Sequence, residues 1–114
     1  MSAYRSNKGK RLYRYKYKYN SRNLVRLKLL KDRKGRNLLK AKYKYNGHGL
    51  LKRTMLFNSD GQKFSSIYYK YNRKELLTRE LHLGPNNTKL FRIEYKYNRN
   101  GRLKKTTRTD LSRP

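Results

Sequence analysis

A repeat of 26 residues runs through most of the chain and limits the folds that it can adopt. The tetrapeptide Tyr-Lys-Tyr-Asn occurs at 17–20, 43–46, 69–72 and 95–98, always at the same spacing. No insertion interrupts this period. A fixed period of this length indicates that one supersecondary unit is repeated along the chain. We therefore expect one repetitive structure within a single domain.

Each unit contains two sequences that favour turns. Asn, Asp and Gly cluster directly after the tyrosines and again about half a unit later, for example in 46–49 and 58–61. An Asn or Asp side chain can hydrogen-bond the backbone of a turn, and Gly readily adopts the positive φ that completes it. The turns recur alternately every 12 and 14 residues and leave runs of about eight residues between them. That length is typical of strands rather than helices.

The runs between turns alternate as two-faced strands do. In 13–19 the odd positions are all Tyr and the even positions are all Lys or Arg. Alternate side chains of a strand point to opposite faces of the sheet. We therefore expect one face of Tyr and Leu and an opposite face of Lys and Arg. The segment 76–83 would also suit a short helix, but the close spacing of the turns favours a strand.

The sequence predicts an all-β fold, an antiparallel meander of about eight strands built from four tandem 26-residue β-hairpin repeats. We expect a basic N-terminal arm over 1–10, the hairpin-repeat domain over 11–109 and a C-terminal tail over 110–114. The expected strands span 12–19, 24–31, 37–45, 50–57, 63–71, 76–83, 89–97 and 102–109.

The unit Tyr95-Lys-Tyr-Asn-Arg-Asn-Gly-Arg-Leu103 resembles the YD repeat of Rhs and related bacterial proteins. In that family, Tyr-Asp-x-x-Gly-Arg-Leu marks consecutive β-hairpins that build a long curved or spiral sheet. The resemblance implies hairpin geometry for 17–20 and its equivalents in the other copies. Asn replaces the family's Asp in all copies, and Gly follows it only at Gly49 and Gly101. The matched positions are structural, so the resemblance implies no catalytic residue, and we do not extend the family's toxin-enclosing shell function to this chain.

Few residues offer catalytic chemistry. Catalysis needs a base, a nucleophile or a metal cluster brought together, and the chain has no Cys and only two histidines, His48 and His82, far apart in sequence. We expect His48 to be a solvated turn residue. The six acidic residues lie in turns or among 33 Lys and Arg, where we expect them to cap turns or neutralise neighbours. We expect neither enzymatic activity nor a metal or other cofactor.

The charge is the feature that points to a partner. The formal net charge is +27, whereas solubility of a small domain needs only about 2–8. Such an excess repels itself and destabilises a compact state, so we expect a polyanion such as nucleic acid to offset it. We expect a structural protein that contacts the phosphates of folded RNA. The expected partners are rRNA and neighbouring proteins of a ribosomal subunit.

Other partners stay open. A basic DNA-compacting protein and a β-hairpin scaffold that binds an acidic protein are the alternatives. An anionic membrane surface is a weaker candidate, because it is usually bound by amphipathic helices. No apolar run approaches the ~18 residues of a membrane-spanning helix, and the N-terminus lacks the apolar segment of a secretory signal. We therefore expect an intracellular protein, in the cytoplasm with the ribosome or, as second choice, in an organelle matrix such as the mitochondrion.

Tyr68 breaks the alternation, because it falls among the cationic positions of its strand. It is therefore the best candidate for stacking on an unpaired base. For the other tyrosines we favour packing within the sheet over base stacking. The candidate RNA-binding residues are Arg5, Lys8, Lys10, Arg11, Arg14, Lys16, Lys18, Arg26, Lys28, Lys40, Lys42, Lys44, Lys52, Tyr68, Lys70, Arg92, Lys96 and Lys104.

Overall fold

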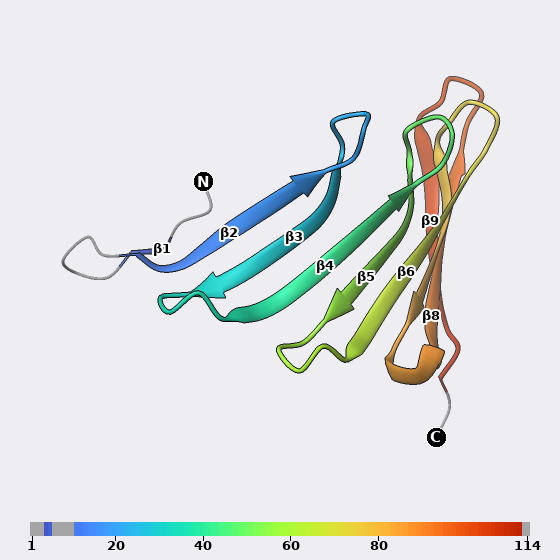
Figure 1. The fold of residues 1–114 in the computed structure, drawn as a ribbon. Coiled ribbons are helices and arrows are strands. Elements are labelled where there is room, and N and C mark those ends of the chain that lie inside the picture. Colours follow the sequence, from blue (N-terminus) through green and yellow to red (C-terminus); the bar gives the residue numbers. More distant parts are fainter. Residues whose placement is uncertain (1–3, 6–10, 113–114) are drawn as a thin grey trace.

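The computed structural model describes residues 4–5 and 11–112, which form one antiparallel β-sheet (Figure 1). Nine strands lie side by side in the order of the sequence. The strands are β1 (Tyr4–Arg5), β2 (Arg11–Tyr19), β3 (Val25–Asp32), β4 (Asn37–Tyr45), β5 (Leu51–Phe57), β6 (Lys63–Tyr71), β7 (Leu77–Leu83), β8 (Lys89–Tyr97) and β9 (Leu103–Asp110). One short 3-10 helix, η1 (Pro85–Asn87), joins β7 to β8.

The predicted all-β meander is confirmed, and each predicted strand from 12–19 onward agrees with the structure to within one residue at either end. The segment 76–83 forms a strand rather than a helix. The predicted arm over 1–10 contains the two-residue strand β1, and the rest of it lies outside the described residues. The predicted tail begins at Asp110, one residue too early, because β9 continues through Asp110.

The turns form as the Asn and Gly pattern predicts. The Oδ1 atom of Asn46 accepts hydrogen bonds from the backbone N–H groups of His48 (2.9 Å) and Leu50 (3.0 Å). Gly49 completes the turn with a φ of 81°, which a residue without a Cβ adopts at no steric cost. The same pair of side-chain bonds forms at Asn20, Asp32, Asn58, Asn72 and Asn98. The turn at Gly84 differs, since it has no side-chain acceptor and uses η1 instead.

Every pair of neighbouring strands contains a shift of register, and the shifts recur with the sequence period. Near the Asn-centred turns the pairing skips Arg26, Lys52, Thr78 and Lys104. Near the opposite end of the strands the pairing skips Leu12, Leu38, Phe64 and Leu90. A β-bulge bends its strand and increases the local twist. Figure 1 shows the result, a sheet that twists strongly from β2 to β9.

The sheet is a single layer. Among the described residues no helix or second sheet covers either face. The chain exposes 8914 Å², whereas a compact monomer of its mass exposes about 6,700 Å². The buried residues in the described part of the chain are Leu29, Ala41, Thr54, Met55, Ser66, Leu83 and Gly84. The core is therefore thin and is built by contacts between neighbouring strands. No helix in the described part of the chain has the length and apolar character needed to cross a membrane.

Candidate nucleic-acid interface

The strand register divides the side chains between two faces. Directly paired residues share a face, and alternate residues along a strand point to opposite faces. The paired series Lys16–Leu29–Lys40–Phe57 defines what we call the cationic face. The strand cations on this face are Arg14, Lys16, Lys18, Lys31, Lys40, Lys42, Lys44, Arg53, Lys63, Lys70, Arg79, Lys89, Arg92, Lys96 and Lys105.

The opposite surface, the tyrosine face, carries every strand tyrosine from β2 to β8 except Tyr68. These residues are Tyr13, Tyr15, Tyr17, Tyr19, Tyr43, Tyr45, Tyr69, Tyr71, Tyr95 and Tyr97. The acidic strand residues are unevenly shared. Asp32, Glu80 and Asp110 lie on the tyrosine face, whereas Glu94 is the one acid among the described strand residues of the cationic face. The net charge is therefore concentrated on one side of the sheet.

The expectation that the leucines share the tyrosine face is only half right. Leu30 and Leu39 do lie there. The apolar side chains that lie instead on the cationic face are Leu27, Leu29, Met55, Phe57, Leu81 and Leu83. The reason is the register. It sets Leu27, Leu29, Met55 and Phe57 opposite lysines of β2 and β4, and it sets Leu81 and Leu83 opposite Tyr68 and Ser66 of β6, which lie on the same face. The cationic face therefore consists of cationic strands separated by partly apolar ones.

Contacts across these strands hold the cations against apolar neighbours. The Nζ atoms of Lys40 and Lys42 lie 5.0 and 5.3 Å from the centre of the Phe57 ring. An ammonium within about 6 Å of an aromatic centre is attracted to the ring face, and a lysine stem can cover apolar surface while its charge stays in water. The positive charges are thereby positioned above the sheet rather than free to spread apart.

Tyr68 lies on the cationic face, as predicted, in the paired row Arg53–Tyr68–Leu81–Arg92. The guanidinium carbon of Arg53 lies 4.8 Å from the centre of the Tyr68 ring. The Nε atoms of Arg53 and Arg92 are buried without a hydrogen-bond partner among the described residues, although Arg92 Nε lies 3.5 Å from Glu94. One face of the Tyr68 ring is thus taken by Arg53 within the protein.

The structure brings together ten of the predicted binding residues on the cationic face: Arg14, Lys16, Lys18, Lys40, Lys42, Lys44, Tyr68, Lys70, Arg92 and Lys96. Lys28 is apart from these ten residues, because it lies on the tyrosine face with its Nζ 4.5 Å from the Tyr15 ring centre. Arg26, Lys52 and Lys104 sit at bulges. The backbones of Arg5 and Arg11 pair with each other, and Lys8 and Lys10 lie outside the described residues.

The cations of this face that the sequence did not predict are Lys31, Arg53, Lys63, Arg79, Lys89 and Lys105. Arg53, Arg79 and Lys105 occupy one column of the repeat, 26 residues apart, and each pairs with the Lys that precedes the final Tyr of the strand before it. Their regular spacing was the available signal. Apolar and charged residues alternate irregularly in their strands, so the column was not visible from one strand alone.

At least five of the ten tyrosine hydroxyl groups on the tyrosine face form hydrogen bonds within the sheet. Tyr45 and Tyr71 donate hydrogen bonds of 2.6 Å to the carbonyl oxygens of Val25 and Leu51. Burial raises the pKa of both phenols above its ordinary value. Tyr97 bonds the carbonyl of the residue 20 positions before it in the same way. These contacts favour packing over base stacking for this face.

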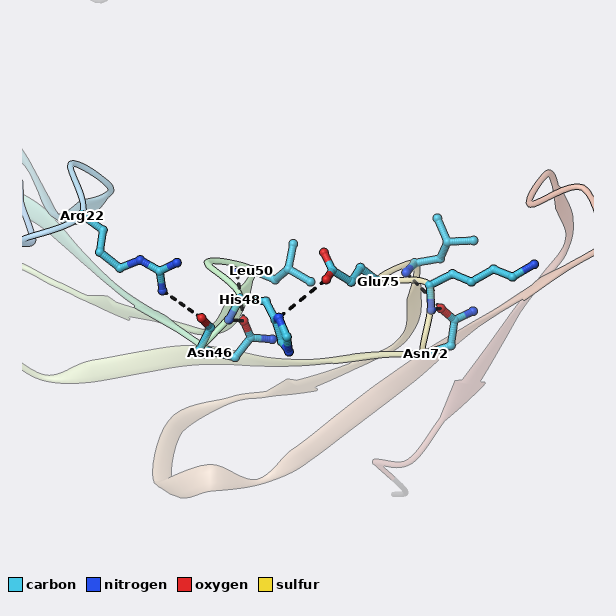
Figure 2. A network of polar contacts seen from close by, with 9 residues as sticks. Arg22, Asn46, His48, Leu50, Asn72 and Glu75 are labelled. Carbon is cyan, nitrogen blue, oxygen red and sulfur yellow. Dashed lines mark hydrogen bonds and ion pairs between the residues drawn. The ribbon is translucent and has the colours of Figure 1, made fainter.

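Polar contacts also join neighbouring Asn-centred turns at one end of the strands (Figure 2). Arg22 donates to the carbonyl oxygen of Gly47 (3.0 Å), and His48 Nδ1 lies 3.6 Å from Glu75 Oε2 in the next turn. His48 is well exposed, as expected of a turn residue. The other histidine, His82, lies on the tyrosine face with Nε2 2.8 Å from a carboxylate oxygen of Glu80. Within the described residues no cluster of three or more His, Asp or Glu side chains could hold a metal ion.

No model of a known protein family matches the chain, and no curated protein matches it either. The arrangement of charge on the sheet is therefore the main structural guide to function.

Proposed function

We propose that the chain binds the phosphate backbone of folded RNA through the cationic face. The observation that carries this proposal is the segregation of charge, with fifteen strand cations and one acid on that face among the described residues. In this role the chain is a structural component and needs no catalytic group, metal or other cofactor.

The spacing of the cations suits a regular polyanion. Alternate residues of a strand lie about 6.6–6.8 Å apart, and neighbouring strands about 4.8 Å apart. Lys40, Lys42 and Lys44 therefore form a row, and the row of Lys16 and Lys18 lies about 9.6 Å away, two strands across. Such a grid offers many phosphate contacts without reading base edges, and phosphate contacts carry little sequence information.

The shape of the sheet favours RNA over DNA. The major groove of DNA admits a helix or a two-stranded ribbon, whereas this surface is a broad sheet within a molecule of 52 × 39 × 30 Å. RNA helices present a wide, shallow minor groove and are bound largely by shape and phosphate contacts. The small size, the absence of Cys and the strong positive charge support a place in a ribosomal subunit, beside rRNA and neighbouring ribosomal proteins.

A charge-reversal pair with a matched control tests the proposal. Lys42→Glu with Lys44→Glu removes two cations from the cationic face, and Lys28→Glu with Arg108→Glu makes the same change in net charge on the tyrosine face. Log affinity for a structured RNA should fall linearly with log salt. The first pair should lower the magnitude of that slope by about 2, while the control pair should leave it nearly unchanged. Equal effects of the two pairs would show that net charge alone matters and would contradict a defined interface.

Sedimentation of a lysate through a density gradient tests the ribosomal form of the proposal. The protein should travel with a ribosomal subunit and stay bound through a moderate salt wash. Travel with DNA, or with an acidic protein after nuclease treatment, would instead support one of the alternatives.

A further inference from the structure

The tyrosine that ends each Tyr-Lys-Tyr motif joins one Asn-turn hairpin to the preceding one. Tyr45, Tyr71 and Tyr97 each donate a hydrogen bond to a carbonyl oxygen 20 residues earlier. The carbonyls belong to Val25, Leu51 and Leu77, the first residues of β3, β5 and β7. This contact therefore recurs at every junction between these hairpins.

At the two outer strands of the sheet, one donor and one acceptor of this type have no counterpart in the described chain. Tyr19 is the equivalent donor in β2, but no hairpin precedes it in the described chain, and its side chain is 56% exposed. Leu103, the first residue of β9, is the equivalent acceptor, and it is also 56% exposed. A donor at one end and an acceptor at the other complement each other when one chain follows another.

The backbone edges match as well. β9 occupies the place in its hairpin that β3 occupies in the first one, and β2 corresponds to β4 in the same way. The outer edge of β9 is unpaired among the described strands. Among the described residues the outer edge of β2 is paired with β1 only at Arg11 and Tyr13, so the described strands leave the stretch from Arg14 to Tyr19 without a partner on that edge.

We propose that the chain associates head to tail with a second copy of itself, β9 of one chain pairing with β2 of the next. The register is that of β3 with β4, which sets Lys105 opposite the next chain's Lys16 and Thr107 opposite its Arg14. Tyr19 of the second copy then donates to the carbonyl of Leu103. The interface continues a pairing that the chain already makes within itself, and it adds strands without closing the assembly.

Charge controls this association. The join sets cations of one chain beside those of the next, and like charges directly opposite destabilise a strand pair. Screening reduces that cost, because the Debye length falls from about 10 Å at 0.1 M salt to about 3 Å at 1 M. The association should therefore strengthen with sulfate concentration, whereas binding to RNA should weaken with salt.

Cysteine cross-linking tests the register, and the native chain has no Cys to interfere. Thr107→Cys chains are mixed with Arg14→Cys chains in concentrated sulfate and oxidised. Paired residues lie about 4.5–5.5 Å apart between Cα atoms, within the range that a disulfide spans, so a mixed disulfide dimer should form. Lys40→Cys replaces Arg14→Cys as the control, because Lys40 holds the same place in the repeat but is already paired on both sides.

The outcomes are distinct. A mixed dimer that forms with Arg14→Cys and not with Lys40→Cys supports the proposal. No dimer, equal cross-linking with the control, or a dominant dimer of Thr107→Cys with itself would overturn it, since the last result means that β9 pairs with β9.

Tyr19→Phe should weaken the association roughly fivefold, the effect of losing one ordinary hydrogen bond, and should leave unfolding of the monomer unchanged. An unchanged affinity would contradict the contact with Leu103.

Discussion

The hydroxyl group of Tyr71 donates a hydrogen bond of 2.6 Å to the main-chain carbonyl oxygen of Leu51. The two residues belong to different Asn-turn hairpins, so the bond joins one repeat of the sheet to the next. It lies beside the bulge at Lys52, where the ladder between β4 and β5 is interrupted. A side chain therefore supports the backbone at a point where the strand pairing is interrupted.

Removing this bond should destabilise the sheet. Tyr71→Phe keeps the ring but leaves the Leu51 carbonyl without its tyrosine partner, and a loss of about 1 kcal/mol in the free energy of unfolding is expected. Urea unfolding in the presence of sulfate measures it. Tyr19→Phe, in dilute protein, is the matched control and should have little effect, because the Tyr19 side chain is exposed. Equal losses in the two variants would show that the inter-hairpin bond adds no stability.

The turn between β6 and β7 holds a strained residue that can be relieved. Glu75 has a φ of 65°, whereas the equivalent positions Gly49 and Gly101 carry glycine. A left-handed conformation costs a residue with a side chain about 1–2 kcal/mol, partly offset by the greater freedom of glycine in the unfolded chain. Glu75→Gly should therefore stabilise the protein by about 0.5–1 kcal/mol in urea unfolding.

Two further variants separate backbone strain from the contact that Glu75 makes. Gly101→Ala places a side chain where φ is 82° and should destabilise by about 1 kcal/mol. His48→Gln removes the imidazole contact with Glu75 without altering any turn and should have only a slight effect, because both side chains are exposed. A loss of stability in Glu75→Gly that His48→Gln reproduces would mean that this contact outweighs the strain.

The strand positions could be predicted because each turn is specified locally. An Asn or Asp side chain bonds the backbone two and four residues ahead, as Asn72 does with Lys74 and Leu76, and a residue of positive φ follows. Every participant lies within a few residues in the sequence. The strands between the turns then have little freedom in length.

The distribution of side chains on the faces could not be predicted in full, because it depends on pairing between strands. The bulges at Lys52 and Phe64 decide which residues of β5 lie opposite which residues of β4 and β6. A shift of one residue moves every side chain of a strand to the other face. The alternation within β2 identified its own two faces, but it did not show that Leu27 and Leu29 would share the face of Lys16 and Lys18.

Acid should reveal the role of Asp32. The backbone hydrogen bond from Arg36, with the Arg36 guanidinium and the backbone hydrogen bond from Lys34, lowers the pKa of this carboxyl below 3.8, although burial acts in the opposite direction. A carboxylate with a lowered folded-state pKa stabilises the fold above its unfolded-state pKa, and this contribution is lost as pH falls through the folded-state pKa. Stability should therefore drop below about pH 3.8.

Asp32→Asn should remove this step. An amide oxygen can accept the same two backbone hydrogen bonds, as Asn58 does in the next turn at that end of the strands. The turn should therefore survive at neutral pH. Acid titration of the unfolding midpoint, compared with the native chain, gives the result. Asp60→Asn, at an exposed turn position, is the control. The prediction is wrong if Asp32→Asn and the native chain lose stability in parallel between neutral pH and pH 3.

Folding should depend on anions, because the native register places like charges directly opposite each other on neighbouring strands. Lys44 pairs with Arg53, Lys70 with Arg79 and Lys96 with Lys105, and directly opposed like charges destabilise a sheet. The thin core has little surplus to offset this, since ordering the backbone costs about 1–2 kcal/mol per residue. An anion that binds only the folded form adds about 2.7 kcal/mol at a hundredfold excess over its Kd.

Amide exchange measured with and without sulfate tests this dependence. The native chain should show weak protection at low salt and strong protection of β2 to β9 in concentrated sulfate. Arg53→Glu with Lys105→Glu turns two of the opposed pairs into pairs of opposite charge, so this variant should reach the same protection at a lower sulfate concentration. Strong protection of the native chain without any anion would show that the hairpins outweigh the repulsion. In that case the partner is needed for function and not for folding.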